Sequence, residues 1–282
     1  MRRATLPPIP ADIATQRPLN LAELPDNHVA WLGHACFAIK IAGNLVLTDP
    51  YLSRTAGPFG FGPQRFLHPA VRSADLPRFD AIVISHNHYD HLDSKALRAY
   101  RWRNETPMIC PLGNGALLSR LGFTEVHELD WWQNWSQAGL TIGALPAVHF
   151  SGRGLLDRNR SLWASVSIAA GERRIWFGGD TAAGAVFDEI GDRAGPFDLA
   201  LVGIGAYEPR IIMEASHATP EEAITIARQI RARHAVGMHW GSIMLTPENP
   251  FEAPARFRKA ALEQQYGASN AWILQVGEAR GF

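Results

Sequence analysis

The chain has 282 residues with 27 basic and 27 acidic side chains, so its formal net charge is zero. This balance argues against a general nucleic-acid binder, and no stretch approaches the roughly 20 uninterrupted apolar residues of a membrane span. The N-terminus lacks the apolar segment of a secretory signal, and two cysteines are too few for a disulfide framework, so we expect a cytoplasmic protein.

The pattern of residues changes at His28. Residues 1–27 are rich in Pro, Ala and Asn and predict an arm on the surface. Residues 28–282 carry short apolar runs with no linker-like change of composition between them, and such runs predict buried strands of a single domain. The runs lie at residues 28–39, 44–49, 81–84, 108–111, 126–129, 140–147, 163–168, 174–177, 199–202, 235–238 and 272–274.

A long loop follows the strand that ends at Asp49. Residues 51–70 hold several glycines and prolines with Phe59 and Phe61 between them. Loops of this length in compact domains are usually functional. The aromatic side chains would either line an apolar substrate or pack against the core, and the sequence leaves both interpretations open. Gln64 and Arg65, in the same loop, are candidates to meet a phosphate or a headgroup.

The next stretch concentrates residues that bind metals. Ala81-Ile82-Val83-Ile84 predicts a buried strand, and the pattern from Asp93 onward predicts a helix. The turn between them carries four ligand-type side chains, His86, His88, Asp90 and His91. The two histidines that lie two positions apart would bind one ion, whereas the Asp-His pair would point elsewhere and bind a second. Imidazole and carboxylate without thiolate favour zinc or another borderline divalent ion.

Three further candidates also end apolar runs: His149, Asp180 and His239. Each alone would more often be a core residue, but together with the turn they give seven ligands. Seven ligands fill two adjacent metal sites if one aspartate bridges them. Asp49, which ends another run, would either hold a ligand imidazole from behind or simply form a turn before Pro50.

The clearest helix is predicted from Thr219 to Arg233, because Thr219 and Glu222 form a capping box. His217 lies just before this helix, where the helix dipole favours anions. Since seven other residues fill the metal positions, we expect His217 to contact the substrate phosphate or to donate a proton to the leaving group. The alternative is a histidine that only pins the loop. A last helix is predicted at residues 255–266.

The sequence resembles the metallo-β-lactamase-fold hydrolases that carry the H-x-H-x-D-H motif, here residues 86–91. Within that superfamily it is most similar to the phospholipases D that hydrolyse N-acyl-phosphatidylethanolamine. The stretches Glu-Leu-Asp-Trp-Trp at 128–132 and Gly-Ala-Tyr-Glu-Pro-Arg at 205–210 carry this likeness, and the second places Tyr207 among the candidate substrate contacts.

The resemblance implies an α/β fold, a four-layer αββα sandwich. It implies one zinc on His86, His88 and His149, a second on Asp90, His91 and His239, and Asp180 between them. It also implies attack by a metal-bound hydroxide, which Asp90 aims, on the phosphodiester, with release of an N-acylethanolamine and phosphatidic acid. A phospholipid substrate would bring peripheral contact with a membrane, and a homodimer is compatible with the sequence.

Other function classes stay open on this fold. One is a lactonase of the L-ascorbate-phosphate type or another small-molecule metallo-hydrolase. A di-iron redox enzyme is a further alternative, but such sites usually carry a carboxylate where this chain has His88. A binding protein that merely retains zinc is the last.

Overall fold

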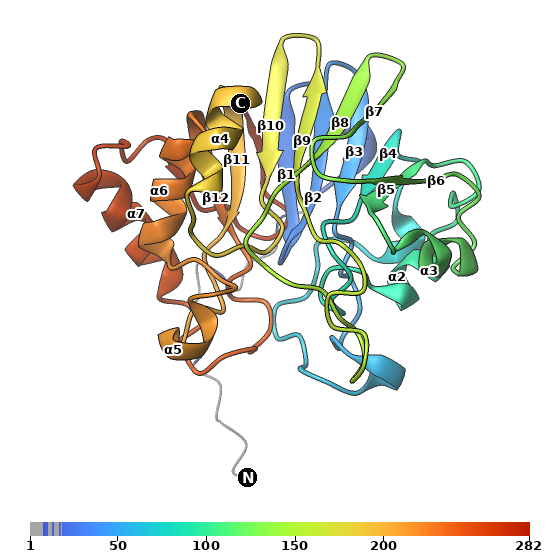
Figure 1. Ribbon diagram of the computed structural model, residues 1–282, viewed down its shortest axis with the longest axis horizontal. Coiled ribbons are helices and arrows are strands. Elements are labelled where there is room, and N and C mark those ends of the chain that lie inside the picture. Colours follow the sequence, from blue (N-terminus) through green and yellow to red (C-terminus); the bar gives the residue numbers. More distant parts are fainter. Residues whose placement is uncertain (1–7, 11–12, 14–16, 18) are drawn as a thin grey trace.

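The computed structural model describes residues 8–10, 13, 17 and 19–282, so the predicted arm at 1–7, 11–12, 14–16 and 18 lies outside the described residues. Two seven-stranded sheets pack face to face with helices on their outer sides (Figure 1). The predicted four-layer αββα sandwich is confirmed. In the described part of the arm, a 3₁₀ turn, η1 (Leu21–Glu23), buries Leu21, and Leu24 follows it into the core.

The first sheet joins an antiparallel half to a parallel half. Its order is β14-β1-β2-β3-β4-β5-β6, antiparallel from β14 to β3 and parallel from β3 to β6. The strands are β1 (His28–Gly33), β2 (Cys36–Ile41), β3 (Asn44–Thr48), β4 (Ala81–Val83), β5 (Met108–Pro111), β6 (Val126–Leu129) and β14 (Ala279–Gly281).

The second sheet repeats this plan. Its order is β13-β12-β11-β10-β9-β8-β7, parallel from β13 to β10 and antiparallel from β10 to β7. The strands are β7 (Asn134–Gln137), β8 (Leu140–Leu145), β9 (Ser165–Ala170), β10 (Arg173–Phe177), β11 (Phe197–Gly203), β12 (Ala232–Met238) and β13 (Ala271–Trp272). The carboxyl ends of the parallel strands of both sheets therefore meet at one edge of the sandwich, where ligand sites of α/β proteins usually lie.

Helices cover the outer face of each sheet (Figure 1). On the first sheet these are α2 (Ser94–Ala99) and α3 (Gly115–Arg120), and on the second α4 (Val186–Arg193), α6 (Pro220–Gln229) and α7 (Ala253–Glu263). A short helix, α5 (Arg210–Met213), and two 3₁₀ turns, η2 (Pro58–Gly60) and η3 (Ser73–Asp75), lie in loops.

Side chains alternate along the strands of the first sheet, which is buried on both faces. Val29 and Trp31 of β1 belong to the core between the two sheets. Ala30 and Leu32, which point the other way, pack in a separate cluster with α2 and α3. A strand that is buried on both faces consists of a nearly continuous run of apolar residues. These strands could therefore be predicted from the apolar runs in the sequence.

The predicted helix at Thr219 begins as expected and ends early. Thr219 caps it and forms the predicted capping box with Glu222. The predicted end at Arg233 is wrong. The helix ends at Gln229 because Arg231 adopts a left-handed conformation, with φ of 59°, and β12 starts directly afterwards.

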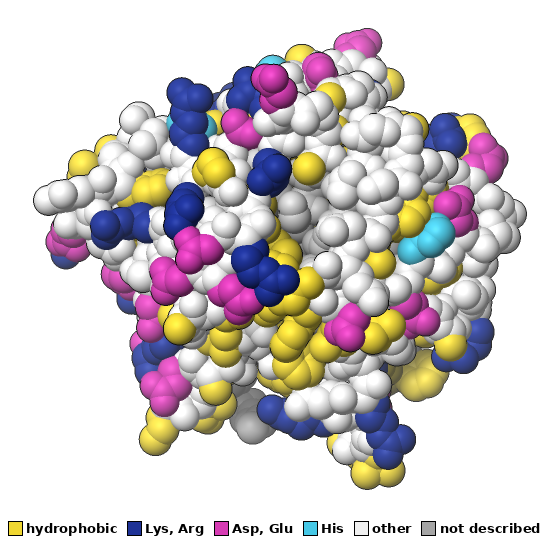
Figure 2. All heavy atoms as spheres, turned by 45° about the horizontal axis from the view of Figure 1, so that its top comes forward, with side chains coloured by type: hydrophobic (Ala, Val, Ile, Leu, Met, Phe, Trp, Pro, Cys, Tyr) yellow, Lys and Arg dark blue, Asp and Glu magenta, His cyan; other side chains and the backbone are white. Residues whose placement is uncertain are grey.

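No helix among the described residues is long and apolar enough to cross a membrane. On the face drawn in Figure 2, acidic and basic side chains are intermingled without a block of either sign. This mixture agrees with the zero formal net charge of the chain.

Candidate metal centre

The loops after the central strands carry all the predicted ligands to one place. Asp49 follows β3, the motif residues follow β4, and the remaining ligand candidates follow β8, β10 and β12. Asp180 can approach the motif because Gly179 precedes it: Gly179 has φ of +55°, and a Cβ there would lie 2.5 Å from Cβ of Ser85. Any other residue at this position would push the two strand ends apart.

One group of donors consists of His86, His88, His149 and Asp180, whose ligand atoms all lie within 4.8 Å of one another. Nδ1 of His88 is 2.8 Å from Nε2 of His86 and 3.3 Å from Nε2 of His149. Three imidazole nitrogens thus converge on one point, beside a carboxylate. This is the set that the resemblance implies for the first ion.

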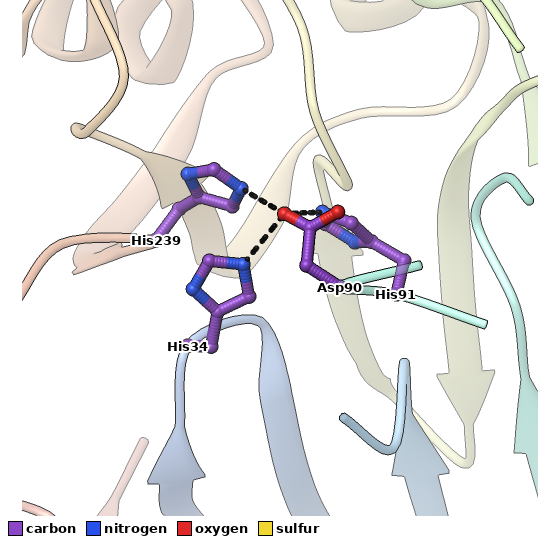
Figure 3. Close-up of side chains that lie close together, drawn as sticks. All are labelled: His34, Asp90, His91 and His239. Carbon is purple, nitrogen blue, oxygen red and sulfur yellow. Dashed lines mark hydrogen bonds and ion pairs between the residues drawn. The ribbon is translucent and has the colours of Figure 1, made fainter. Parts of the chain in front are cut away.

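A second group lies against the first and contains Asp90, His91 and His239, joined by a further histidine, His34 (Figure 3). Oδ2 of Asp90 is 3.4 Å from Nε2 of His239 and 3.7 Å from Nε2 of His91. The motif turn was expected to direct His86 and His88 to one ion and Asp90 and His91 to another, and this arrangement agrees with that expectation.

Asp180 stands between the two groups. Its Oδ1 lies 3.1 Å from Nε2 of His239, and its Oδ2 lies 3.1 Å from Nε2 of His91. The same Oδ2 is 3.8 Å from Nε2 of His149 in the first group. A single carboxylate therefore faces both sets of imidazoles, as a bridging ligand would.

Neighbouring polar groups fix the orientation of the imidazoles. Nδ1 of His91 lies 2.6 Å from Oδ2 of Asp49, and Nδ1 of His149 lies 2.9 Å from the carbonyl oxygen of Ser216. Both rings therefore turn Nε2 toward the centre. Support from a carboxylate or carbonyl behind the ring is usual for metal-binding histidines. The interpretation of Asp49 as the residue that holds a ligand imidazole agrees with this contact.

The carboxylates and imidazoles of the centre shift one another's pKa values. Burial alone raises the pKa of Asp180, but His239 and His91 hold that pKa well below its usual range. Burial and the adjoining imidazoles keep the pKa of His86 well below its usual value. Although burial lowers it, the Asp180 carboxylate raises the pKa of His239 to about 9. Ionised carboxylates and neutral imidazoles are the forms that bind metal, so a bound cation would displace the proton of His239.

The donors fit a divalent metal. In a tetrahedral zinc site with Zn–N distances of about 2.0–2.1 Å, two ligand nitrogens lie about 3.3 Å apart, close to the separations within the first group. Nε2 of His91 and Nε2 of His239 are buried, and although an Asp180 oxygen lies 3.1 Å from each, neither nitrogen makes a hydrogen bond of normal geometry within the described part of the chain. Buried polar atoms are rarely left without a partner. Nitrogen and oxygen donors without thiolate suit zinc or another borderline divalent ion.

His217 also enters the centre. Its Nε2 lies 4.0 Å from Oδ2 of Asp180, and its ring centroid is 5.1 Å from that of His149. Burial is the main reason that the pKa of His217 is lowered to about 4. The side chain is thus buried beside both donor groups, and the Asp180 carboxylate opposes this lowering of the pKa.

The aromatic loop turns its side chains outward. Phe59 is 99% exposed and Phe61 is 75% exposed, so the interpretation that they pack against the core is wrong. Gln64 is exposed in the same loop, where it pairs with Thr55 in a β-bridge. Contact of these three side chains with a substrate stays a prediction.

Two other predicted substrate contacts are placed differently. The guanidinium of Arg65 is buried and donates to the carbonyl oxygens of Tyr51, at 2.5 Å, and Leu67, at 3.4 Å. Tyr207 is fully buried, and its hydroxyl donates to Oε1 of Glu252 at 2.7 Å. Both polar groups are engaged in holding loops, so direct contact with a substrate is not favoured for either.

Sequence reasoning missed the roles of two residues. His34 ends the apolar strand β1 just as the recognised ligands end theirs, so the same rule could have found it. Arg153 donates from Nη1 to the carbonyl oxygens of Asn87, at 2.7 Å, and Leu92, at 2.8 Å, and its guanidinium stacks on Tyr89. It clamps the motif turn from a loop more than sixty residues away, and no sequence pattern marks it.

An αββα sandwich with a buried His/Asp centre at its strand ends defines a metallo-hydrolase of the metallo-β-lactamase fold. The chain belongs to the family described as the beta-lactamase superfamily domain, whose model matches residues 44–240. N-acyl-phosphatidylethanolamine-hydrolyzing phospholipase D 1 of Caenorhabditis elegans is 40% identical over 75% of this chain and 63% of its own length. The mitochondrial enzyme of the same name from Saccharomyces cerevisiae is 34% identical over 77% of this chain and 48% of its own.

The chain thus spans less than two thirds of the length of these two relatives. Among solved structures, isothiocyanate hydrolase from Delia radicum gut bacteria superposes with a TM-score of 0.70 over 90% of this chain and 99% of that one. At 19% sequence identity this likeness supports the fold alone.

Proposed function

We propose that this metallo-hydrolase is a phosphodiesterase of the phospholipase D type, which cleaves N-acylated phosphatidylethanolamine to an N-acylethanolamine and phosphatidic acid. The observation that carries the proposal is the pair of donor groups on either side of Asp180, in a chain 40% identical to a phospholipase of that name. Two adjacent cations are the arrangement that phosphoester hydrolysis commonly uses.

The two donor groups support a particular distribution of the cations over the ligands. His86, His88 and His149 would hold one ion, and Asp90, His91 and His239 a second, with Asp180 facing both. Zinc is the ion that this donor set favours. When bound, such ions supply Lewis acidity toward the phosphoryl oxygens and lower the pKa of water.

The chain's own side chains then orient the reactants and move protons. The carboxylate of Asp90 accepts a hydrogen bond from the attacking water and aims it. Nε2 of His217, 4.0 Å from Asp180, would face the phosphate, whose negative charge favours the protonated imidazole, so that His217 would give its proton to the leaving oxygen. Gly179 lets the end of β10 approach the end of β4, and Arg153 holds the motif turn in place, so that these groups would act on one phosphate.

The edge around the centre has the character of a lipid-facing surface. Three segments expose large apolar side chains there: Phe59 and Phe61, Leu155 and Leu156, and Ile211 and Ile212, all at least 67% exposed. Figure 1 shows α5 and the loops near residues 59 and 155 along the same edge of the sandwich, the lower one in that view. Aliphatic and aromatic side chains exposed in a group mark an interaction surface.

Cations stand beside the apolar residues. Arg54, Lys95 and Arg98 are exposed and line a groove of about 620 Å³ together with Phe59 and Tyr89 of the motif. Basic side chains near an apolar edge favour contact with the phosphates of a bilayer. We therefore extend the proposal to peripheral contact with a phospholipid membrane, which would bring the acyl chains of the substrate to Phe59 and Phe61.

Replacing Phe59 and Phe61 by serine should weaken hydrolysis of long-chain substrates more than that of short-chain ones. Losing the burial of one phenylalanine against an acyl chain costs about 1.5–3 kcal/mol, so kcat/KM for long chains should fall at least about tenfold. Leu262→Ser, at a residue of α7 that is 62% exposed, is the matched control and should leave both rates unchanged. Equal losses for both chain lengths would remove the loop from the binding site.

The substrate class is tested by hydrolysis with the metal-loaded protein. N-acyl phospholipids, simple phospholipids, cyclic nucleotides and phosphorylated lactones are compared under one set of conditions. The proposal expects N-acyl phospholipid to be cleaved with the highest kcat/KM and the lactone least. Preferential opening of the lactone would replace the phosphodiesterase by the lactonase alternative.

A further inference from the structure

His34 is the one histidine of the second donor group that the proposed ligand set does not use (Figure 3). It is 1% exposed, and its Nε2 lies 3.0 Å from Oδ2 of Asp90. The ring centroid of His34 is 4.0 Å from that of His239. An imidazole this deep in the centre and this close to a ligand carboxylate needs a function of its own.

The backbone around His34 is held in an unusual conformation. His34 has φ of 59°, in the left-handed region that is uncommon for residues other than glycine, and so do Asp49, at 30°, and His239, at 64°. Such conformations are strained and persist only where surrounding contacts impose them, often at functional sites. Three residues of one centre thus share a left-handed backbone conformation.

Two hydrogen bonds impose the conformation of His34. Its carbonyl oxygen accepts from Nε1 of the buried Trp31, at 2.8 Å, and from the backbone N–H of His239, at 3.2 Å. The turn between β1 and β2 is thereby tied directly to the turn after β12 in the other sheet. His34 therefore meets the second donor group twice, through its ring at Asp90 and through its backbone at His239.

The two ring nitrogens of His34 differ in their contacts. Nε2 faces Asp90, so the neutral imidazole carries its proton there and donates to the carboxylate. Nδ1 is buried without a hydrogen-bond partner among the described residues. A buried acceptor left in this way destabilises the folded chain, and an apolar side chain of similar size would avoid that cost. The cost is explained if the N–H at Nε2 is required.

We propose that His34 is a positioning residue of the metal centre: its Nε2–H fixes the carboxylate of Asp90, so that Asp90, His91 and His239 bind their cation together. The role needs a donor at Nε2 and does not need His34 to bind the metal. It rests on the metal binding of the proposed function and is independent of the substrate. Groups that orient ligands in this way usually contribute about 10- to 100-fold in metal affinity.

The test compares His34→Leu, which removes the donor but keeps the volume, with His34→Gln, which offers an amide N–H at about the reach of imidazole Nε2. Stepwise binding of zinc is measured against a chromophoric chelator, and absorption of the cobalt-loaded protein reports the ligand set. His34→Leu should weaken one of the two binding steps about 10- to 100-fold and spare the other. His34→Gln should restore most of that affinity and the cobalt spectrum.

His234→Leu is the matched control, because Nδ1 of His234 is also buried without a partner within the described residues. His234 stacks on Trp272 and lies five residues before His239 on β12, roughly 16 Å along the strand. This control should leave both binding steps unchanged. The melting temperature of each metal-free variant shows whether folding itself has changed.

The outcomes separate the possible failures. Equal weakening by His34→Leu and His34→Gln would overturn the positioning role, and loss of one ion with a changed cobalt spectrum in the glutamine variant would make His34 itself a ligand. Equal loss of both binding steps, together with a lower melting temperature of the metal-free protein, would leave His34 a purely structural residue. Wild-type protein that binds no metal would instead refute the metal centre on which the proposed function depends.

Discussion

Asp180→Asn is expected to disturb both donor groups at once. Oδ1 of Asp180 faces His239 and Oδ2 faces His91, each at 3.1 Å, and His149 of the first group is 3.8 Å from Oδ2. An asparagine keeps the shape of the side chain but replaces one oxygen by an N–H₂ group and removes the negative charge. The second group must then lose an acceptor whichever oxygen is replaced, and both groups lose the negative charge that would hold their cations.

Metal analysis after loading and dialysis measures the effect. The wild-type chain should retain close to two zinc-class ions, and Asp180→Asn less than one. Because residues that only support a ligand already change affinity by about 10- to 100-fold, loss of a shared ligand should exceed a hundredfold. Hydrolysis should fall together with metal content.

Asp188→Asn on α4 provides the matched control, since Asp188 is an exposed carboxylate that accepts from Gln229 far from the centre. It should retain both ions. A wild-type protein that is fully active with one tightly bound ion, or an Asp180→Asn variant that keeps two, would contradict a bridged pair of sites.

Local patterns explain why the convergence of these side chains could be predicted from the sequence. Four candidate ligands lie within six residues, directly after a strand that is buried on both faces, and the remaining three end strands of the same kind. The carboxyl ends of parallel strands meet at one edge of a sheet, so recognising the strands already brings the side chains together. The capping box at Thr219 is equally local and was predicted for the same reason.

Contacts between distant segments explain what could not be predicted. Asp90, the partner of His34, is 56 residues away in the sequence, and no sequence pattern indicates that the two residues are in contact. Arg65 and Tyr207 lie in stretches typical of substrate contacts, but the packing of other loops buries their polar groups. β14 is short and exposed, and it exists only because it pairs with β1 at the opposite end of the chain.

The early end of α6 illustrates a different limit. Helices often end at a glycine in the left-handed conformation, which the sequence would show. Here Arg231 adopts that conformation, and the apolar pattern continues through Ile230 and Ala232 without interruption. The side chain of Arg231 pairs with Asp192 of α4. The end of α6 is therefore accompanied by an ion pair between the turn that follows it and α4, and the sequence carries no local signal for it.

His217→Ala is the second substitution with a large expected effect, because it tests the proton transfer directly. The backbone of His217 is held independently of its ring: its N–H donates to Met213 at 2.8 Å and its carbonyl oxygen accepts from Arg210 at 2.9 Å. An alanine keeps both bonds, and the capping box two residues later is untouched. The variant therefore removes the imidazole from the rim of the centre without releasing the loop.

General acid–base work by a positioned histidine is worth about two to four orders of magnitude, so kcat of His217→Ala should fall by that factor while zinc content and melting temperature stay near the wild-type values. His127→Ala is the control. His127 is a half-buried residue of β6 whose ring forms a hydrogen bond with the carboxylate of Glu125, and this variant should have the wild-type kcat. Near-normal turnover of His217→Ala would leave the histidine with a loop-pinning role only. Loss of metal along with activity would make it a ligand, because Nε2 of His217 lies 4.0 Å from Oδ2 of Asp180 and is close enough to share a cation.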